Sequence, residues 1–306
     1  MKGLVTRTTG IWYKVLADVG AVDCRLRGQY RLRGNKQTNP VAVGDRVEFD
    51  MQDDGTGIIH TVTDRRNYIV RKATKLSKQT HVIAANIDLL CVVATLESPR
   101  TSTGFIDRLL VTAEAYHIPA CVVFNKTDLY DSALQETLAT LKQIYTSAGY
   151  PVINTSAITG AGIDSLIDAI RGATVLFSGH SGVGKSALIN AIEPSLNLRT
   201  GEVSQWSEKG KHTTTYAEIH SLHSAEAYLI DSPGIKEFGM VDISPDELGH
   251  FFPEIRKHLH GCRFNTCTHT HEPDCAVKQA VNEGLISEER YANYLRILED
   301  CVSRNF

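Results

Sequence analysis

Residues 179–186 read Gly-His-Ser-Gly-Val-Gly-Lys-Ser, and they stand between an apolar run at 174–178 and a helix-like segment that continues to residue 192. Glycines at these spacings let backbone N–H groups converge on phosphate oxygens at the start of a helix. In such a loop Lys185 would bridge the β- and γ-phosphates, and Ser186 would ligate Mg²⁺. Alone, the stretch predicts an α/β fold with a site for a nucleoside triphosphate.

A second motif, earlier in the chain, narrows the nucleotide to one with guanine. Residues 125–128 read Asn-Lys-Thr-Asp and follow the apolar, strand-like run 120–124. The Asp128 carboxylate can accept hydrogen bonds from N1–H and N2–H₂ of guanine together, and adenine offers neither donor there. Lys126 would lie over the base plane, and Asn125 would hold this loop to the phosphate loop. A polar turn after a strand explains either motif alone, but the two motifs in their strand contexts favour guanine.

The order of the motifs differs from that in ordinary small GTPases, in which the phosphate loop comes before the base motif. Here the base motif is followed by Thr-Ser-Ala at 155–157, where Ala157 could present a backbone N–H to guanine O6. The phosphate loop comes next, then Gly-Lys-His-Thr-Thr-Thr at 210–215, and finally Asp-Ser-Pro-Gly at 231–234. This is a full set of guanine-nucleotide motifs in circularly permuted order.

The last two segments carry the predicted magnesium and hydrolysis chemistry. Asp231 would hold Mg²⁺ through water, and a threonine of 210–215 would complete the metal's shell, with Thr214 preferred. In Ras-like enzymes a glutamine in the last motif orients the attacking water, but the residue at that place here is Ile235. We therefore expect either slow hydrolysis or a polar group borrowed from elsewhere, and His212 is the best candidate. A loop histidine with no catalytic part is the alternative.

The predicted site residues fall into three groups. His212 is the predicted catalytic residue, and the predicted magnesium ligands are Ser186, Thr214 and Asp231. The residues predicted to contact GTP come from four loops and are Asn125, Lys126, Thr127, Asp128, Ser156, Ala157, Gly179, His180, Ser181, Gly182, Val183, Gly184, Lys185, Ser186, Ala187 and Gly234.

A cysteine and histidine cluster near the C-terminus predicts a metal site. Its spacing is Cys262-x₄-Cys267-x-His269-x₅-Cys275. Three thiolates and an imidazole are ligands of structural zinc, and four such ligands close a tetrahedral site. Loops this short could not build a core unaided, so a metal would staple them. A disulfide or free thiols are the competing interpretations, and His271 is the alternative imidazole.

Composition indicates a cytoplasmic protein. The chain has 306 residues, of which 42% are hydrophobic, and no apolar run approaches the roughly 20 residues that span a bilayer. The first residues lack the apolar core of a signal peptide. The four cysteines outside the cluster are typical of small core residues in a reducing compartment. We expect no membrane partner, and we expect a monomer because no feature indicates an obligate partner chain.

The net charge of −3 is unevenly distributed. Residues 1–80 carry 15 Lys+Arg against 8 Asp+Glu, whereas residues 81–240 carry 10 against 16 and residues 241–306 carry 7 against 11. A basic segment on an acidic protein indicates a polyanionic partner for that segment. Its arginines alternate with other residues, which would place them on one face of a strand pair; they are Arg25, Arg27, Arg31 and Arg33.

We predict three domains. Residues 1–65 read as short strands, near 10–15, 22–27 and 43–49, and favour an OB-type β-barrel that binds RNA on one face. A solvated arginine face on a purely structural barrel is the alternative. Residues 66–240 form the permuted α/β P-loop GTPase domain, doubly wound, with 65–80 as an exposed Lys- and Arg-rich linker. Residues 241–306 form a small zinc-binding α domain.

The predicted elements of the central domain alternate between strands and helices. The expected strands are 87–95, 120–124, 151–154, 174–178, 216–220 and 227–230. The expected helices are 105–116, 134–148, 163–170 and 185–192, and a further helix, 288–300, belongs to the last domain.

Together these features resemble the circularly permuted, ribosome small subunit-dependent GTPase family (RsgA, also called YjeQ). The likeness covers the whole chain, from the basic barrel through the permuted motifs to the cysteine-rich tail, with His180 as a small departure. The resemblance implies a factor in late maturation of the small ribosomal subunit that binds this subunit and its rRNA. It also implies subunit-stimulated hydrolysis of GTP to GDP and phosphate, Mg²⁺ with GTP, one structural Zn²⁺, and a catalytic role for His212. A GTPase switch with a non-ribosomal partner is the alternative.

Overall fold

The computed structural model describes residues 1–28, 40–71, 81–198, 217–231 and 243–304. The predicted residues His212, Thr214 and Gly234, with Arg31, Arg33 and Ile235, lie outside these residues. By packing, the chain divides into two compact units. The first is 1–89, 167–177 and 203–237, and the second is 90–166, 178–202 and 238–306. The three predicted domain boundaries remain a prediction.

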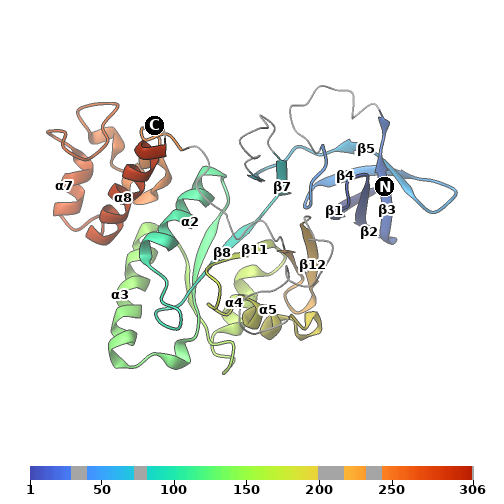
Figure 1. Cartoon of the computed structure of the whole chain (residues 1–306), viewed down its shortest axis with the longest axis horizontal. Coiled ribbons are helices and arrows are strands. Elements are labelled where there is room, and N and C mark those ends of the chain that lie inside the picture. The colour runs from blue at the N-terminus through green and yellow to red at the C-terminus, as the bar shows by residue number, and fades with distance from the viewer. Residues whose placement is uncertain (29–39, 72–80, 199–216, 232–242, 305–306) are drawn as a thin grey trace. The chain divides into compact units, whose positions relative to one another are not determined.

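The N-terminal strands close into a barrel, as predicted, and the barrel has five strands (Figure 1). Each strand pairs with two others in the order β1-β2-β3-β5-β4, and β4 pairs back to β1. The β3–β5 pair is parallel and the rest are antiparallel, which is the arrangement of an OB-like barrel. The strands are β1 (Lys2–Thr8), β2 (Trp12–Ala17), β3 (Gly20–Leu26), β4 (Arg46–Met51) and β5 (Gly57–Val62).

Alternate side chains along the strands point into the barrel and fill it. In β3 every second side chain is buried, so Cys24 faces the core and Arg25 faces outward. Two glycines allow the strands to approach closely. A Cβ added to Gly57 would lie 2.5 Å from the Cys24 sulfur, and one added to Gly3 would lie 2.4 Å from Val15. The barrel core consists of Val5, Tyr13, Val15, Val22, Cys24, Leu26, Val41, Val47, Phe49 and Ile59.

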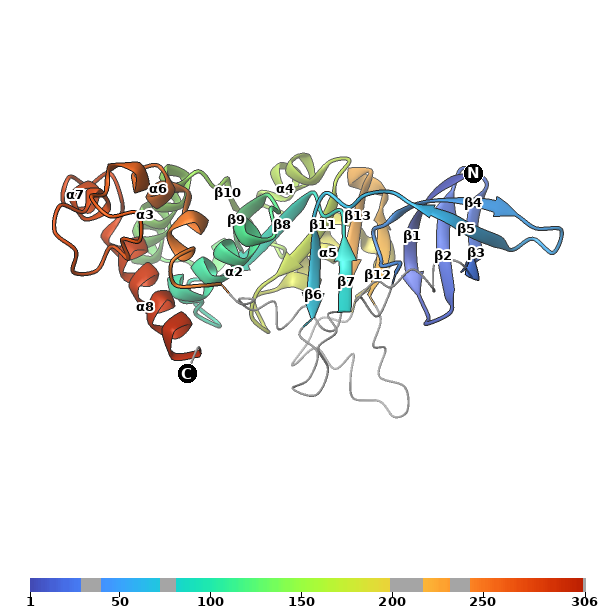
Figure 2. The ribbon, with the colours of Figure 1, turned by 90° about the horizontal axis from the view of Figure 1, so that it is seen from above.

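The segment after the barrel is only partly the exposed linker that the sequence predicts. Its first described residues form β6 (Tyr68–Arg71), which pairs with β7 (His81–Ala85); Figure 2 shows the two side by side. The Arg65 guanidinium donates to both carboxylate oxygens of the fully buried Asp45, at 2.8 and 2.7 Å. The prediction was wrong for 65–71, because a strand pairing and a buried ion pair compete successfully with solvation of this charged sequence.

The rest of the first unit supplies the strand that leads into the phosphate loop. Strands β11 (Thr174–Ser178) and β13 (Ala227–Asp231) are parallel, and β12 (Glu218–Leu222) is antiparallel to β13. This sheet is therefore mixed rather than uniformly parallel. Strand β12 also pairs with β1 at Arg7 and Glu218.

The second unit holds the base-reading half of the nucleotide site. Its strands β8 (Leu89–Ala94), β9 (Ala120–Phe124) and β10 (Val152–Asn154) are parallel neighbours and nearly continuously apolar, as expected of strands covered on both faces. Asp131 caps the helix after the base motif by accepting a hydrogen bond from the Leu134 N–H. The helices are α2 (Thr103–Ala115), α3 (Ser132–Ala148), α4 (Ile163–Ile170), which continues into the first unit, and α5 (Lys185–Ile192).

The C-terminal module, residues 243–304, is helical, as predicted. Its helices are α6 (Pro253–Arg256), α7 (Ala276–Asn282) and α8 (Glu288–Arg304). Its apolar cluster includes Phe252, Tyr294 and Cys301, and it also takes in Val111 from α2. Among the described residues, no helix is both long enough and apolar enough to cross a membrane.

Candidate functional site

The phosphate loop has a backbone that glycine makes possible. Gly182 and Gly184 have φ values of +85° and +91°, in the left-handed region that other residues rarely adopt. A Cβ added to Gly184 would lie 2.4 Å from the amide nitrogen of Asn125, and one added to Gly179 would lie 2.2 Å from the Val93 carbonyl oxygen. The glycines of the motif therefore permit the turn, and they also let the loop lie close to neighbouring segments.

Lys185 and Ser186 lie in the first turn of α5. Backbone N–H groups in the first turn of a helix have no acceptor within the helix itself and can bind an anion. The Lys185 ammonium donates to the carbonyl oxygens of Gly179 and His180, at 2.7 and 2.6 Å. It therefore lies over the loop whose N–H groups would receive phosphate.

The base motif is hydrogen-bonded directly to the phosphate loop. The Asn125 side chain is buried, and its amide donates to the Val183 carbonyl oxygen at 2.9 Å. Its amide oxygen accepts from the Thr155 hydroxyl at 3.2 Å. Lys126 follows in the left-handed region, with φ of +62°. One asparagine thus joins the three loops that carry the base motif, the 155–157 motif and the phosphate loop.

The carboxylate expected to bind guanine has a serine beside it. The Ser156 hydroxyl donates to Asp128 Oδ1 at 2.5 Å, and the Asp128 residue is exposed. Thr127 donates to the Thr155 carbonyl oxygen at 3.1 Å. The carboxylate is therefore oriented by the neighbouring loop while it remains accessible to a base.

Tyr130 is a residue of this site that sequence reasoning missed. Its buried hydroxyl donates to the Asn125 carbonyl oxygen at 2.6 Å and accepts from the Leu96 N–H at 2.9 Å. Burial raises the pKa of Tyr130, so the hydroxyl keeps its proton for this bond. Its position two residues after the base motif was the only available signal.

His180 has a defined neighbour within the phosphate loop. Its ring stacks on Phe105, with centroids 3.6 Å apart and an angle of 24° between the planes. Burial and the nearby Lys185 charge lower the pKa of His180 below its usual value.

The remaining described nucleotide residues follow the expected elements. Asp231 ends β13 and is exposed. Ser181 is exposed in the phosphate loop, Val183 is fully buried beneath it, and Ala187 belongs to the first turn of α5.

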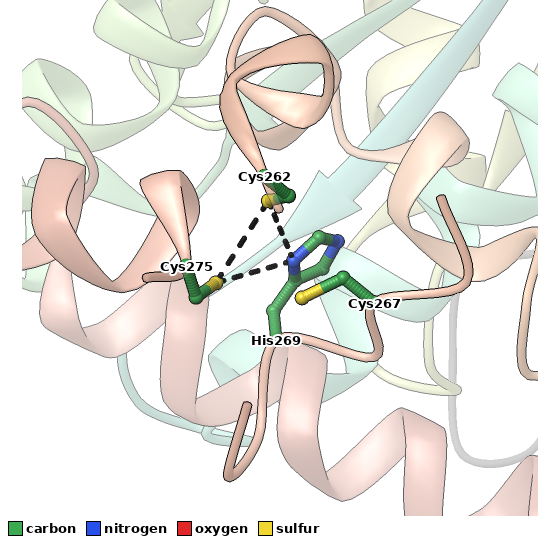
Figure 3. Close-up of side chains that lie close together, drawn as sticks. All are labelled: Cys262, Cys267, His269 and Cys275. Atoms are coloured by element: carbon green, nitrogen blue, oxygen red, sulfur yellow. Dashed lines mark hydrogen bonds between the residues drawn. The ribbon is translucent and has the colours of Figure 1, made fainter. Parts of the chain in front are cut away.

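The four predicted zinc donors gather at one point (Figure 3). The sulfurs of Cys262, Cys267 and Cys275 and a ring nitrogen of His269 all lie within 4.8 Å of one another. The two sulfurs of Cys262 and Cys275 are 3.9 Å apart, and His269 Nδ1 is 3.6 and 3.4 Å from them. Tetrahedral zinc with bonds of about 2.3 Å to sulfur and about 2.0 Å to nitrogen requires separations of about 3.8 and 3.5 Å. The donor set therefore fits a zinc ion.

Neighbouring groups hold the metal loop in shape. The Glu272 carboxylate accepts from the Thr268 N–H at 2.7 Å, the Thr268 hydroxyl at 2.6 Å and the Thr270 N–H at 2.9 Å. These bonds lower the pKa of Glu272 to about 2 against the opposing effect of burial. His271 is exposed and bonds to Thr270, so it lies outside the cluster. All seven cysteines are described, and none forms a disulfide.

Comparison with known proteins places these features in one family. The model of the RsgA GTPase domain matches residues 62–241, and that of the RsgA N-terminal domain matches residues 2–59. The small ribosomal subunit biogenesis GTPase RsgA of Bacteroides fragilis is 50% identical over 301 residues, covering 98% of this chain and 97% of that protein.

Two solved structures share the fold. The crystal structure of YjeQ from Thermotoga maritima has a TM-score of 0.81 and 35% identity, and the match covers 98% of both chains. The circularly permuted GTPase YloQ has a TM-score of 0.77 and 30% identity, and the match covers 99% of this chain and 95% of that one.

Proposed function

Because the chain belongs to the RsgA family of circularly permuted GTPases, we propose that it hydrolyses GTP to GDP and phosphate in the maturation of the small ribosomal subunit. The observation that carries the nucleotide assignment is the bond between Asn125 and Val183, which unites base and phosphate loops into one site. Two separate motifs, far apart in sequence and each too common to decide alone, are thereby brought together.

The described residues divide the work of binding. Asp128, oriented by Ser156, accepts from the guanine edge, and Lys126 covers the base. The backbone N–H groups of residues 182–186 receive the phosphates, and Lys185 exchanges its carbonyl partners for phosphate oxygens. Ser186 and Asp231, with Thr214, are the proposed magnesium ligands, and Mg²⁺ bound with GTP neutralises charge on the phosphates.

For hydrolysis we keep His212 as the proposed residue that orients the attacking water. The support is chemical, because Ile235 cannot orient water and an imidazole can. Replacing His212 by Ala should lower subunit-stimulated turnover while GTP affinity stays close to wild type. Unchanged turnover would remove the residue from the mechanism.

Zinc is proposed as the structural ion of the C-terminal module. Its four ligands would be Cys262, Cys267, His269 and Cys275, whose separations fit tetrahedral coordination. The ion would cross-link the loop 262–275, which holds no long helix of its own.

The barrel is the proposed contact with ribosomal RNA. On its outer face the Arg25 guanidinium lies over the Trp12 ring, 3.9 Å from the centroid, and the exposed Lys14 lies on the same pair of strands. An unpaired base can stack on such an aromatic and guanidinium surface, while the basic charge attracts phosphate. Ribosomal work would place the chain in the cytoplasm, and we propose that it acts as a monomer.

The deciding experiment is hydrolysis of GTP and ATP by the full chain, alone and with purified small or large ribosomal subunits. We expect GTP turnover to rise with small subunits only, and ATP turnover to stay at background. Guanine binding with no response to either subunit would favour a switch with a non-ribosomal partner. Equal use of ATP would contradict the guanine assignment itself.

A further inference from the structure

The phosphate loop touches helix α2 through an aromatic contact that nucleotide binding does not require. Phe105 lies in the first turn of α2, where Ser102 caps the helix, and its ring stacks on His180 at 3.6 Å. A stack this close fixes both ring planes and limits how far the first residues of the phosphate loop can shift.

The segment that leads into α2 also lies against the nucleotide loops. The Lys126 ammonium of the base motif donates to the Ser98 carbonyl oxygen at 2.5 Å. In the phosphate loop, a Cβ added to Gly182 would lie 3.2 Å from the Pro99 ring. The start of α2 and both loops therefore form one packed group within the second unit.

Helix α8 of the C-terminal module binds the N-terminal end of α2, the end that carries Phe105. The Thr103 hydroxyl donates to Glu289 at 2.7 Å, and the Asn293 amide donates to Thr103 at 3.1 Å and to Asp107 at 2.7 Å. The Arg290 guanidinium donates to Asp107 at 2.6 Å. Four polar contacts thus fix α8 to the first turn and a half of α2, next to the residue that stacks on the phosphate loop.

Helix α8 continues this connection to the metal loop. The Tyr291 hydroxyl donates to the His269 carbonyl oxygen at 2.6 Å, and the Tyr294 hydroxyl donates to the Thr268 carbonyl oxygen at 2.9 Å. Asp107 and Arg290 are almost fully buried, whereas Phe105 is half-buried and His180 is exposed. The connection is therefore buried where α8 meets α2 and reaches the surface at the phosphate loop.

We propose that Phe105 is a positioning residue for the phosphate loop, and that α8 sets its place through Thr103 and Asp107. The proposal rests on the proposed function, because it concerns guanine nucleotides bound at this loop. Coupling between two sites is reciprocal, so GDP and GTP should affect α8 differently, and α8 should affect the relative affinity for the two nucleotides. This route runs through α2.

The test uses the zinc-loaded full chain and four variants: Phe105→Leu, Phe105→Tyr, Thr103→Val and the Phe105→Leu/Thr103→Val double variant. The affinities for GDP and for a non-hydrolysable GTP analogue are measured first, followed by hydrogen exchange of 288–304 with each nucleotide bound. We expect exchange in α8 to differ between the two nucleotides in the wild type. Phe105→Leu and Thr103→Val should each reduce this difference and change the GDP-to-GTP affinity ratio by about fivefold. Phe105→Tyr should retain both, because it keeps the ring.

The double variant distinguishes one route from two independent effects. If both residues act through the same connection, its affinity ratio should be no further from wild type than that of the single variants. Tyr68→Leu is the control, because it also replaces a partly exposed aromatic ring by leucine and lies in the other compact unit. It should leave the ratio and the α8 exchange unchanged.

Two results would overturn the proposal while leaving the GTPase assignment intact. One is identical α8 exchange with GDP and the GTP analogue in the wild type, and the other is a wild-type difference retained in both Phe105→Leu and Thr103→Val. Failure of the wild-type chain to bind either nucleotide would instead overturn the proposed function, and this proposal with it.

Discussion

The N-terminal barrel and the C-terminal module are two small bodies of similar length that are stabilised in opposite ways. The barrel closes its own backbone hydrogen bonds, and all ten residues of its apolar cluster come from between Val5 and Ile59. The C-terminal module has a metal-ligand cluster at one side and takes Val111 of α2 into its core. Its buried Arg290 bonds to Asp107 of α2 as well as to its own Glu254.

The difference shows that similar size does not mean similar independence. A closed barrel satisfies most of its strand edges internally, and here the pairing with β12 adds to β1 only at Arg7. A short helical segment buries too little apolar surface to pay the entropy of ordering, so it needs a cross-link and a neighbour. We therefore expect perturbations of the module to depend on metal and α2, and perturbations of the barrel to remain local.

Removal of the metal should give the largest difference in response between the barrel and the C-terminal module. Replacing Cys262 by Ala should abolish stoichiometric zinc and unfold the module, since structural zinc contributes on the order of 10 kcal/mol in small domains. Hydrogen exchange should rise across 243–304 and stay unchanged in β1–β5. Cys301→Ala replaces a buried cysteine of the same module that is not one of the metal ligands, and this variant should retain zinc. Hydrogen exchange that stays low across 243–304 without the metal would contradict the idea that the C-terminal module depends on it.

The dependence on α2 should be the next largest effect. Asp107→Ala leaves the Arg290 charge buried with one carboxylate partner fewer, and loss of a buried partner costs about 3–5 kcal/mol. Arg108→Ala, next in the same helix, removes an ion pair to Asp300 that is about 40% exposed, and should cost under about 1 kcal/mol. Urea unfolding of the module, followed separately from the barrel, measures both. Equal costs would mean that burial does not govern this interface.

The barrel and the C-terminal module should also differ in their affinity for RNA, since residues 1–80 are basic and residues 241–306 are acidic. Trp12→Ala should weaken binding of single-stranded ribosomal RNA fragments by about 1–3 kcal/mol, the usual value of one base stacked on an aromatic ring. Trp12→Phe should restore part of the affinity. Phe264→Ala, an exposed aromatic residue of the module beside Arg263, is the matched control and should change little. Equal losses at both sites would remove the barrel's special role.

The smallest expected effect tests whether the barrel behaves as a closed core. Ile59→Val deletes one methylene from a fully buried position and should cost about 0.5–1.5 kcal/mol. Ile58→Val, on the opposite face of β5, should cost less because that side chain is only half-buried. Barrel unfolding should report the difference, with no change in the module. A loss of stability in the module would contradict the local character assigned to the barrel.

Sequence reasoning was accurate where a short motif coincides with a change in periodicity. The predicted strands 120–124 and 174–178 and helices 163–170 and 185–192 match the observed bounds. Apolar runs bounded by glycine or polar turns carry that information locally. The zinc donors are also local, since four ligands within fourteen residues need no knowledge of the fold to be recognised.

Long-range pairings were the part that local patterns could not reveal. Strands β1 and β5 were not predicted, since Lys, Thr and His interrupt the apolar alternation and the neighbouring strands decide their pairing. The Asp107–Arg290 pair and the role of Tyr130 belong to this class too, because neither lies in a recognisable motif. Nothing in the sequence of α2 sets Asp107 apart, because its partner Arg290 lies 183 residues away.

The separation of Asp107 and Arg290 by 183 residues has a consequence for the order in which the protein is made. Synthesis proceeds from the N-terminus, so the barrel strands, complete by Val62, can pair long before the C-terminal helices exist. Helix α2 is made early, but Val111 stays uncovered and the Asp107 carboxylate stays without Arg290 until α8 has been synthesised. During translation this face of α2 therefore stays exposed until α8 has been made and can pack against it.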